Sequence, residues 1–195
     1  MKIILAGSLG HISKPLTNEL VQNGHQVVVI SSNTNREKQI QELGAKAAIG
    51  SLQDADFLTD IFAGADLVYS MVPPANYFDH SLDLLAYYRR LGGNYANAIN
   101  QSGVKQVINL SSIGAHMDKG NGILLGTYHV EQLLNELPTH VSITHIRPTE
   151  FYYNLLPHIR TAKNKGYIAF NTSDAVLNSW VSPLDISDVI AEEIS

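Results

Sequence analysis

The sequence predicts an α/β fold, in which helices cover both faces of a doubly wound parallel β-sheet. Short apolar runs of strand length alternate with segments of helical length along most of the chain. Several helical segments end at a glycine, as at Gly44, Gly64 and Gly103, which is a common helix stop. With 195 residues, 45% of them hydrophobic, the chain can bury a sizeable core.

The alternation places each element approximately. The expected strands are residues 3–6, 27–30, 47–49, 67–70, 107–110 and 141–146, and the expected helices are residues 12–23, 35–43, 54–62, 77–102 and 122–137. In the long fourth helix, Gly92 and Gly93 predict a break or a kink. After Pro148 the alternation gives way to an aromatic and polar stretch, so we place a domain boundary near residue 150.

The turn after the first expected strand is the most informative part of the chain. Gly7 and Gly10 form a Gly-x-x-Gly turn that leads straight into a helix, with Pro15 in its first turn and Gly24 at its end. Such a turn lets the pyrophosphate of a dinucleotide reach backbone N–H groups and the positive end of the helix. The alternative is a turn that only connects strand to helix. A second strand at βαβ spacing favours the phosphate site, and with it a Rossmann-type NAD(P)-binding domain over residues 1–150.

Composition excludes several other classes of function. The formal net charge is −5 at pH 7 and no cluster of Lys and Arg exceeds Arg89-Arg90, so no nucleic-acid partner is expected. The chain has no cysteine, which removes disulfides, thiolate metal sites and cysteine nucleophiles. Its histidines lack the spacing of metal ligands, so no metal is expected. The apolar run before Gly7 is too short for a signal peptide or a membrane span, so we expect a cytoplasmic protein with no membrane partner.

Four segments of the chain resemble, in order, the atypical short-chain dehydrogenases/reductases of the NmrA-like and quinone-reductase-like branch. They are residues 7–12, 50–54, 103–112 and 145–156. Residues 180–189 are similar to the Asp-Ile-Ala-Asp-Val element of the same branch, which in relatives precedes a further part of the substrate lobe. The resemblance implies that residues 151–195 form a small, partial substrate-binding lobe. A fragment of a longer product and a protein with a trimmed lobe are both consistent with this pattern.

The resemblance also implies which residues line a cofactor pocket. Those expected at the pyrophosphate are Gly7, Leu9, Gly10, His11 and Ile12. Those expected at the adenine are Ser51 and Leu52, and those at the ribose and nicotinamide are Met71, Val72 and Pro73. The alternatives are that Leu52 belongs to the core and that residues 72–74 only end a strand.

The residues after the second strand bear on which dinucleotide is bound. NAD-binding domains of this fold carry a carboxylate there, which binds the adenosine ribose. This chain has no carboxylate in that loop and instead carries Ser32, Asn33 and Arg36. Hydroxyl, amide and guanidinium donors suit the additional phosphate of NADP, so NADP is the expected cofactor and NAD the alternative. The other interpretation of Arg36 and Lys38 is that they only cover a solvated helix.

A proton donor is expected on the fifth helix, where typical members of the superfamily carry Tyr-x-x-x-Lys. Here Tyr128 is present and Gln132 stands in the lysine position. Gln132 can bond ribose hydroxyls but carries no charge to favour a tyrosinate, so Tyr128 is expected to be a weaker acid catalyst. Ser111, or its neighbour Ser112, stands where the family places a substrate-orienting hydroxyl. A packed aromatic side chain is the alternative role for Tyr128.

These residues together predict an NADPH-dependent oxidoreductase that passes hydride to a small carbonyl or quinone acceptor. The main alternative, which Gln132 keeps open, is a non-catalytic NAD(P) sensor that acts on a protein partner. A sugar-nucleotide epimerase or dehydratase shares the fold but needs an intact Tyr-x-x-x-Lys and a full substrate lobe. The apolar residues of the helix expected over residues 77–102 either pack on the core or form the interface of a homodimer.

Overall fold

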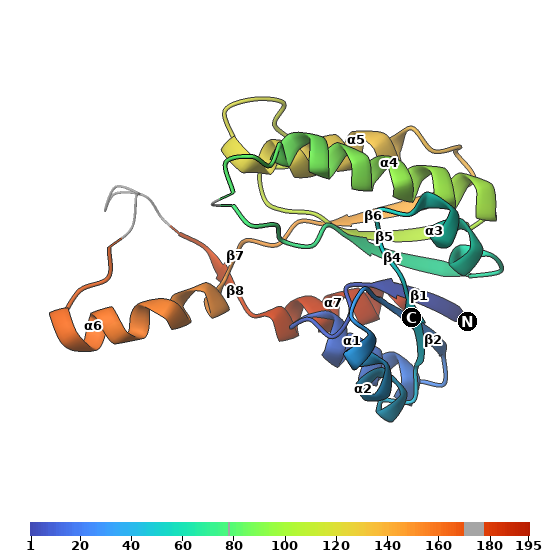
Figure 1. The fold of residues 1–195 in the computed structure, drawn as a ribbon, viewed down its shortest axis with the longest axis horizontal. Helices are drawn as coiled ribbons and strands as arrows, with labels where there is room; N and C mark the ends of the chain where they lie inside the picture. The colour runs from blue at the N-terminus through green and yellow to red at the C-terminus, as the bar shows by residue number, and fades with distance from the viewer. Residues whose placement is uncertain (78, 170–177) are drawn as a thin grey trace.

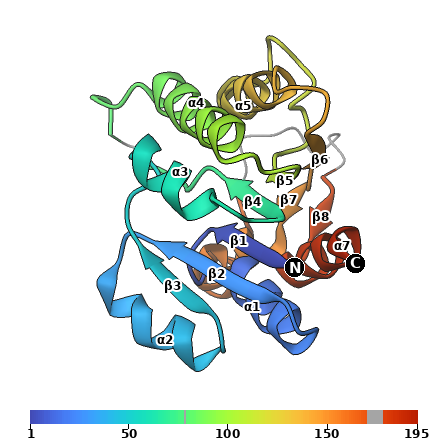
Figure 2. The same ribbon diagram turned by 90° about the vertical axis from the view of Figure 1, so that its right-hand side faces the viewer.

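The computed structural model describes residues 1–77, 79–169 and 178–195. The fold is built on a parallel sheet of six strands in the order β3-β2-β1-β4-β5-β6 (Figure 2). The strands are β1 (Lys2–Ala6), β2 (Gln26–Ser31), β3 (Lys46–Ile49), β4 (Leu67–Met71), β5 (Gln106–Leu110) and β6 (Ser142–Ile146). The order reverses at β1, where Ile4 lies opposite Val28 of β2 on one side and Val68 of β4 on the other. This confirms the doubly wound, Rossmann-type sheet, and such sheets bind ligands at the point of reversal.

Helices cover both faces of this sheet (Figure 1). One face carries α3 (Ala55–Phe62), α4 (Leu84–Ser102) and α5 (Leu125–Asn135), and the other carries α1 (Ser13–Gln22), α2 (Glu37–Glu42) and α7 (Pro183–Ile194). Successive side chains of β1 point to opposite faces, so Ile4 and Ala6 pack with α3 to α5, whereas Ile3 and Leu5 pack with α1 and α7. Burial on both faces explains why the strands are continuous apolar runs.

The observed α4 differs from the expected long helix in its start and in its continuity. It begins after Asp83, whose side chain accepts a hydrogen bond from the backbone N–H of Ala86 at 2.9 Å, a typical N-cap. It also runs unbroken through Gly92 and Gly93, so the expected break is wrong. A Cβ at Gly92 would lie 3.3 Å from the Cα of Val130, so the missing side chain lets α4 and α5 pack closely.

Part of the aromatic stripe of α4 packs inside the protein. Tyr88 and Tyr95 are buried in the core that α4 shares with α3 and α5. A Cβ at Gly126 of α5 would lie 2.6 Å from the ring of Tyr88, so the tyrosine rests directly on the α5 backbone. These two side chains follow the core-packing alternative, and the homodimer stays a prediction.

The segment after β6 leaves the sheet and then returns to it. β7 (Glu150–Phe151) pairs in parallel with β8 (Trp180–Val181), and between them η3 (Tyr152–His158) and α6 (Ile159–Lys165) extend away from the main body (Figure 1). α7 then packs against α1 and buries Ile186, Ile190 and Ile194. The assignment of residues 151–195 to a substrate-binding lobe stays a prediction, and within that range α7 packs onto the helical layer beneath the sheet. No helix in the described ranges is long and apolar enough to cross a membrane.

Candidate functional site

The turn at residues 7–10 joins the end of β1 to the start of α1, at the point where the strand order reverses. Ser8 within this turn has a left-handed backbone with a φ of 51°, and its N–H donates to a carbonyl of β2 at 3.1 Å. The Ser8 hydroxyl donates to the hydroxyl of Ser31 at 3.0 Å, so the turn is held against the end of β2. A Cβ at Gly7 would lie 2.3 Å from the Oγ of Ser13, so any larger residue would displace this buried side chain.

Gly10 faces open space at the start of α1. The residue is exposed, and a Cβ there would meet only the carbonyl oxygen of Gly7, at 3.3 Å. α1 begins at Ser13, and no side chain caps its N-terminus. The Lys14 N–H donates to the carbonyl of Gly10 at 3.0 Å and Pro15 has no N–H, so in this first turn the N–H of Ser13 is the donor left for an anion. This cradle fits the pyrophosphate of a dinucleotide, because it offers both the space and the donors.

The other residues expected at the pyrophosphate have different surroundings. Leu9 is half-buried, whereas Ile12 is 7% exposed and belongs to the core beneath α1. His11 is exposed, and the centroid of its ring lies 4.0 Å from that of Tyr153 in η3. This ring contact joins the glycine turn to the segment that extends beyond the sheet.

A pocket of about 450 Å³ opens beside the glycine turn, between α1 and α2. Its lining residues are Leu9, Lys14, Arg36, Gln39, Glu42 and Leu43. The Nη1 of Arg36 donates to the Oε1 of Gln39 at 3.3 Å. The ammonium of Lys14, in the first turn of α1, is a second cation in this pocket. The pocket therefore has two positive charges, with Glu42 as its acidic residue.

Ser32 and Asn33 lie in the exposed loop between β2 and η1 (Thr34–Arg36), outside the lining of this pocket. The backbone N–H of Asn33 donates to the Oγ of Ser31 at 3.2 Å, and its side-chain oxygen accepts from the N–H of Asn35 at 3.0 Å. These bonds shape the loop and leave the Ser32 side chain exposed.

The two residues expected at the adenine follow β3 at the same edge of the sheet. Ser51 is exposed, and Leu52 is half-buried against the core shared by α3 and α4. The Leu52 carbonyl accepts a hydrogen bond from the side chain of Asn94 at 3.1 Å. Leu52 therefore packs on the core, as its alternative interpretation holds, and still lies at the edge where the cradle opens.

Met71, Val72 and Pro73, expected on the nicotinamide side, continue from the end of β4 and are all half-buried. Two of their carbonyls are held by α4. The hydroxyl of Tyr95 donates to the carbonyl of Met71 at 2.9 Å, and that of Tyr87 donates to the carbonyl of Pro73 at 3.4 Å. These bonds fix the backbone path at this edge of the sheet.

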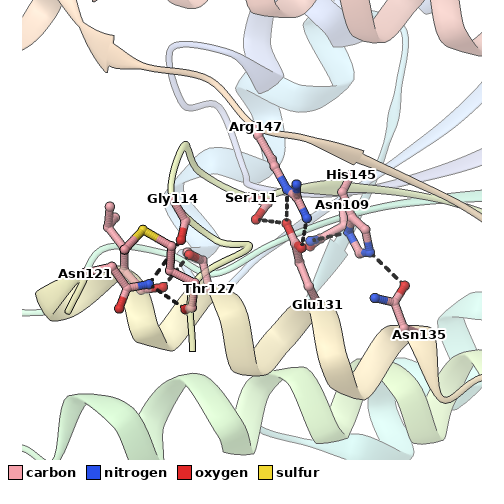
Figure 3. A network of polar contacts seen from close by, with 11 residues as sticks. Asn109, Ser111, Gly114, Asn121, Thr127, Glu131, Asn135, His145 and Arg147 are labelled. Carbon is pink, nitrogen blue, oxygen red and sulfur yellow. Dashed lines mark hydrogen bonds and ion pairs between the residues drawn. The ribbon is translucent and has the colours of Figure 1, made fainter. Parts of the chain in front are cut away.

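The three residues expected to carry the chemistry are not joined to one another by hydrogen bonds. Ser111 lies just beyond β5, is 8% exposed, and its hydroxyl donates to the Oε1 of Glu131 at 2.5 Å (Figure 3). Tyr128 is half-buried on α5, with its ring edge-on to that of His129 at a centroid distance of 5.6 Å. Gln132, one turn further along α5, is exposed. The partner of the Ser111 hydroxyl is thus Glu131 and not Tyr128.

Glu131 is the centre of a buried polar cluster (Figure 3). The residue is 1% exposed, and Arg147 donates to both of its carboxylate oxygens, from Nε at 2.9 Å and from Nη2 at 2.5 Å. Burial raises the pKa of Glu131, but the hydrogen bonds from Arg147 and Ser111 outweigh it and hold the pKa below its ordinary value. The same pairing raises the pKa of Arg147. The carboxylate is therefore ionised at neutral pH.

Next to this cluster lies a series of hydrogen bonds in which each residue donates to the next (Figure 3). The hydroxyl of Ser70 donates to Oδ1 of Asn109 at 3.1 Å, and the Nδ2 of Asn109 bonds the Nδ1 of His145 at 3.1 Å. Because an amide nitrogen only donates, the proton of His145 is on Nε2, which bonds the Oδ1 of Asn135 at 3.0 Å. Burial lowers the pKa of His145 more than the charge of Glu131 raises it, which keeps the ring neutral at pH 7.

The model of the NAD(P)H-binding family matches residues 7–195 of this chain. The chain belongs to the NAD(P)H-binding family. Membership agrees with the open cradle at residues 7–10 and, together with the fold, confirms the resemblance to the atypical short-chain dehydrogenases/reductases.

Solved structures share the fold of this NAD(P)H-binding chain at low sequence identity. The triphenylmethane reductase of Citrobacter sp., complexed with NADP(H), is 17% identical with a TM-score of 0.83, over 100% of this chain and 65% of its own. The NADPH-dependent quinone oxidoreductase of Escherichia coli, complexed with NADPH, is 18% identical with a TM-score of 0.79, over 99% of this chain and 64% of its own. The chain therefore spans slightly less than two thirds of the length of either structure.

One curated relative is similar over a shorter stretch. The decarboxylating sterol-4-alpha-carboxylate 3-dehydrogenase of Dictyostelium discoideum is 32% identical over 66 residues. This stretch is 34% of the present chain and 20% of the dehydrogenase, so the chain spans only a small part of that relative.

Lys14, Glu131 and Arg147 are the residues near the site that sequence reasoning missed. A signal existed for Glu131, because it lies next to Val130 and three residues before Leu134, on the apolar face of its helix. A carboxylate at such a position needs a buried partner. Arg147 directly follows β6, at the same edge of the sheet as the serine after β5. Among the described residues, no three His, Asp or Glu side chains are grouped so that they could hold a metal ion.

Proposed function

We propose that this chain is a reductase that binds NADPH and passes a hydride to a small carbonyl or quinone acceptor. The open cradle at residues 7–10, with free space over Gly10 and no side-chain cap on α1, is the observation that carries the proposal. It lies where the strand order reverses, which is where dinucleotides bind in doubly wound sheets. The nicotinamide supplies the hydride when bound, so the chain itself has to hold the cofactor, orient the acceptor and move a proton.

The pocket between α1 and α2 supports NADPH over NADH within this proposal. The guanidinium of Arg36 and the ammonium of Lys14 line the same pocket, beside the turn that would hold the pyrophosphate. Two cations suit the additional phosphate of NADPH, for which charge-assisted hydrogen bonds are the strong contacts. Glu42 opposes this charge in part, so the proposal rests on the two cations outweighing one carboxylate.

The names of the two structural neighbours support a conjugated acceptor. One is named for triphenylmethane and the other for quinone, and both were solved with NADP(H) or NADPH. A quinone also suits the missing lysine, because its reduced anion is comparatively stable and needs only a weak proton donor. In this proposal Tyr128 donates the proton to a reduced carbonyl, whereas a reduced quinone depends little on it, and the acceptor lies on the side of the cradle where His11 contacts Tyr153.

A calorimetric comparison of NADPH and NADH tests the assignment of the cofactor. We expect NADPH to bind more tightly, and we expect Arg36→Ala and Lys14→Ala each to weaken NADPH while leaving NADH nearly unchanged. Each charge-assisted hydrogen bond contributes roughly 1.5–3 kcal/mol, so each substitution should lower the affinity for NADPH roughly 10- to 100-fold. Lys105→Ala, which removes an exposed lysine before the start of β5, is the matched control and should change neither affinity. Equal affinities for the two dinucleotides in the parent chain contradict the assignment.

A non-catalytic NAD(P) sensor is the second candidate function, because two features weaken the catalytic machinery. Gln132 supplies no charge beside Tyr128, and the hydroxyl of Ser111 is bonded to Glu131 rather than to the tyrosine. A chain of this kind would bind the dinucleotide and signal its presence to a protein partner. Turnover, rather than binding, separates the two candidates.

Oxidation of NADPH in the presence of quinones and aromatic aldehydes is the test of turnover. If Tyr128 donates a proton to a reduced aldehyde, Tyr128→Phe should lower kcat about 100-fold with little change in NADPH affinity, since general acid catalysis contributes on that scale. Gln132→Lys should raise kcat and shift its pH profile toward lower pH, because a nearby ammonium favours the deprotonated phenol. Quinone reduction should depend little on Tyr128. Binding of NADPH without acceptor-dependent oxidation, in the parent and in Gln132→Lys, favours the sensor.

A further inference from the structure

The direction of the hydrogen bond between Ser111 and Glu131 can be assigned from chemistry alone. The two oxygens lie 2.5 Å apart, and both carboxylate oxygens of Glu131 also accept from the guanidinium of Arg147. An ionised carboxylate can only accept hydrogen bonds, so the proton between Ser111 and Glu131 belongs to the serine. Ser111 is the donor, and its hydroxyl proton points inward.

Ser111 therefore has no proton left to offer to a ligand. Its hydroxyl proton goes to Glu131, and its backbone N–H donates to the carbonyl of Ile146 at 2.8 Å. What the hydroxyl retains is lone pairs, which accept hydrogen bonds. Ser111 keeps 8% of its surface exposed, whereas Glu131 keeps 1%, so a ligand at this edge reaches the serine rather than the carboxylate.

The register of the sheet places this acceptor on the nicotinamide side of the proposed cofactor site. Leu110 of β5 lies opposite Met71 of β4, so Ser111 lies one residue beyond that pair, beside Val72 at the carboxyl edge of the sheet. On the nicotinamide ring the carboxamide N–H is the hydrogen-bond donor, and the hydroxyls of the adjoining ribose are the other donors at this end of the cofactor. A carbonyl acceptor, in contrast, offers only an oxygen, with which Ser111 cannot bond.

We propose that Glu131 is a positioning residue that fixes Ser111 as a hydrogen-bond acceptor for the carboxamide N–H of the nicotinamide, rather than as a donor to the substrate carbonyl. This inference rests on the proposed function. It leaves polarisation of the acceptor to groups other than Ser111, and it makes the group at the nicotinamide carboxamide position a determinant of affinity.

Binding of two dinucleotides that differ in this one group tests the proposal. The probes are NADP⁺ and its acetylpyridine analogue, in which an acetyl group replaces the carboxamide and removes the N–H donors. The parent chain should favour NADP⁺. Ser111→Ala should weaken NADP⁺ by up to about ten-fold, the scale of one hydrogen bond, and leave the analogue unchanged. Ser142→Ala, an exposed serine at the opposite end of the neighbouring strand, is the control and should alter neither affinity.

Glu131→Leu gives a second readout that loss of structure alone would not produce. Leucine has a similar volume and no hydrogen-bonding group, so it removes the acceptor of the serine proton, while Arg147, whose side chain is 41% exposed, can bond water instead. The freed hydroxyl should then donate to the acetyl oxygen, so the analogue should bind several-fold more tightly while NADP⁺ weakens. Thermal unfolding of each variant checks that it is folded.

Three results would overturn the inference. If Ser111→Ala weakens the binding of both dinucleotides equally, or of neither, the serine does not accept a hydrogen bond from the carboxamide. A folded Glu131→Leu variant with the parent's ratio of affinities shows that the carboxylate does not set the direction of the bond. A parent chain that binds neither dinucleotide overturns the proposed function together with this inference, whereas binding with an unchanged ratio overturns the inference alone.

Discussion

Replacing Gly10 with valine is expected to abolish dinucleotide binding while the protein stays folded. A Cβ at Gly10 would meet one carbonyl oxygen, at 3.3 Å, which has to shift by a few tenths of an ångström, and the residue does not use a left-handed backbone, so the fold can accommodate a side chain. The isopropyl group would instead fill the space over the N-terminus of α1 that the pyrophosphate needs. Losing two hydrogen bonds to a charged group, at roughly 1.5–3 kcal/mol each, should raise the Kd for NADPH at least about 100-fold.

Calorimetry with NADPH measures this effect, and valine substitutions at two other glycines serve as comparisons. Gly93→Val places the same side chain on α4, where an added Cβ meets nothing within 4 Å, and should leave binding intact. Gly7→Val should lower stability, because its Cβ would lie 2.3 Å from the Oγ of Ser13 and would displace that buried side chain. A folded Gly10→Val protein with the parent's affinity for NADPH would remove the glycine turn from the site.

Arg147→Ala is expected to destabilise the protein strongly by breaking a buried ion pair. It leaves the carboxylate of Glu131, which is 1% exposed, with Ser111 as its remaining bonded partner. Breaking a buried ion pair by removing one partner costs roughly 3–5 kcal/mol. The Arg147 side chain is 41% exposed and water can enter in its place, so we expect about 3 kcal/mol, the lower end of that range.

Urea unfolding measures the loss, and its pH dependence identifies the cause. In the parent chain the pKa of Glu131 lies below its ordinary value of 4.5, so the carboxyl contributes stability that is present above pH 4.5 and lost on acidification. Without Arg147, burial raises the folded-state pKa, so the carboxyl opposes folding more as the pH rises. The difference between parent and variant should therefore grow from about pH 4 to about pH 7.

Two further variants separate the lost ion pair from other effects of removing Arg147. Glu131→Gln combined with Arg147→Ala should be more stable than Arg147→Ala alone, because no buried charge remains. Arg160→Ala, on the exposed part of α6, should change the free energy of unfolding by less than about 0.5 kcal/mol. A pH-independent loss that Glu131→Gln does not relieve would contradict the role of the pair.

The sequence predicted the sheet and the glycine turn because their signals are local. The apolar runs of a sheet buried on both faces follow one another along the chain, and the cradle at residues 7–10 is a short turn. The polar cluster has no such local signal, because Glu131 and Arg147 lie 16 residues apart on different elements and meet only when β6 pairs with β5. Arg36 was predicted from its loop, but Lys14 was missed for the same reason as the polar cluster, since it comes to line one pocket with Arg36 only in the folded chain.

The start of α4 could not be predicted from the apolar pattern, because it depends on a single polar side chain. Asp83 ends the loop before α4 by capping its first turn, and nothing in the apolar spacing favours it over the earlier residues. The glycine pair at 92–93 suggested a break because glycine costs a helix roughly 0.5–1 kcal/mol relative to alanine. Close packing against α5 at Gly92 offsets that cost, and only the tertiary structure reveals it.

The short pairing of β7 with β8 holds together the two ends of the segment that leaves the sheet. Phe151 lies opposite Val181, and the rings of Tyr152 and Trp180 stack with centroids 6.2 Å apart, so the two ends of residues 152–179 are held side by side. With the ends closed in this way, doubling the length of a flexible insertion costs only about 0.6 kcal/mol of loop entropy. A change in the length of chain between Tyr152 and Trp180 should therefore leave α7 in its place against α1 and the strand order untouched.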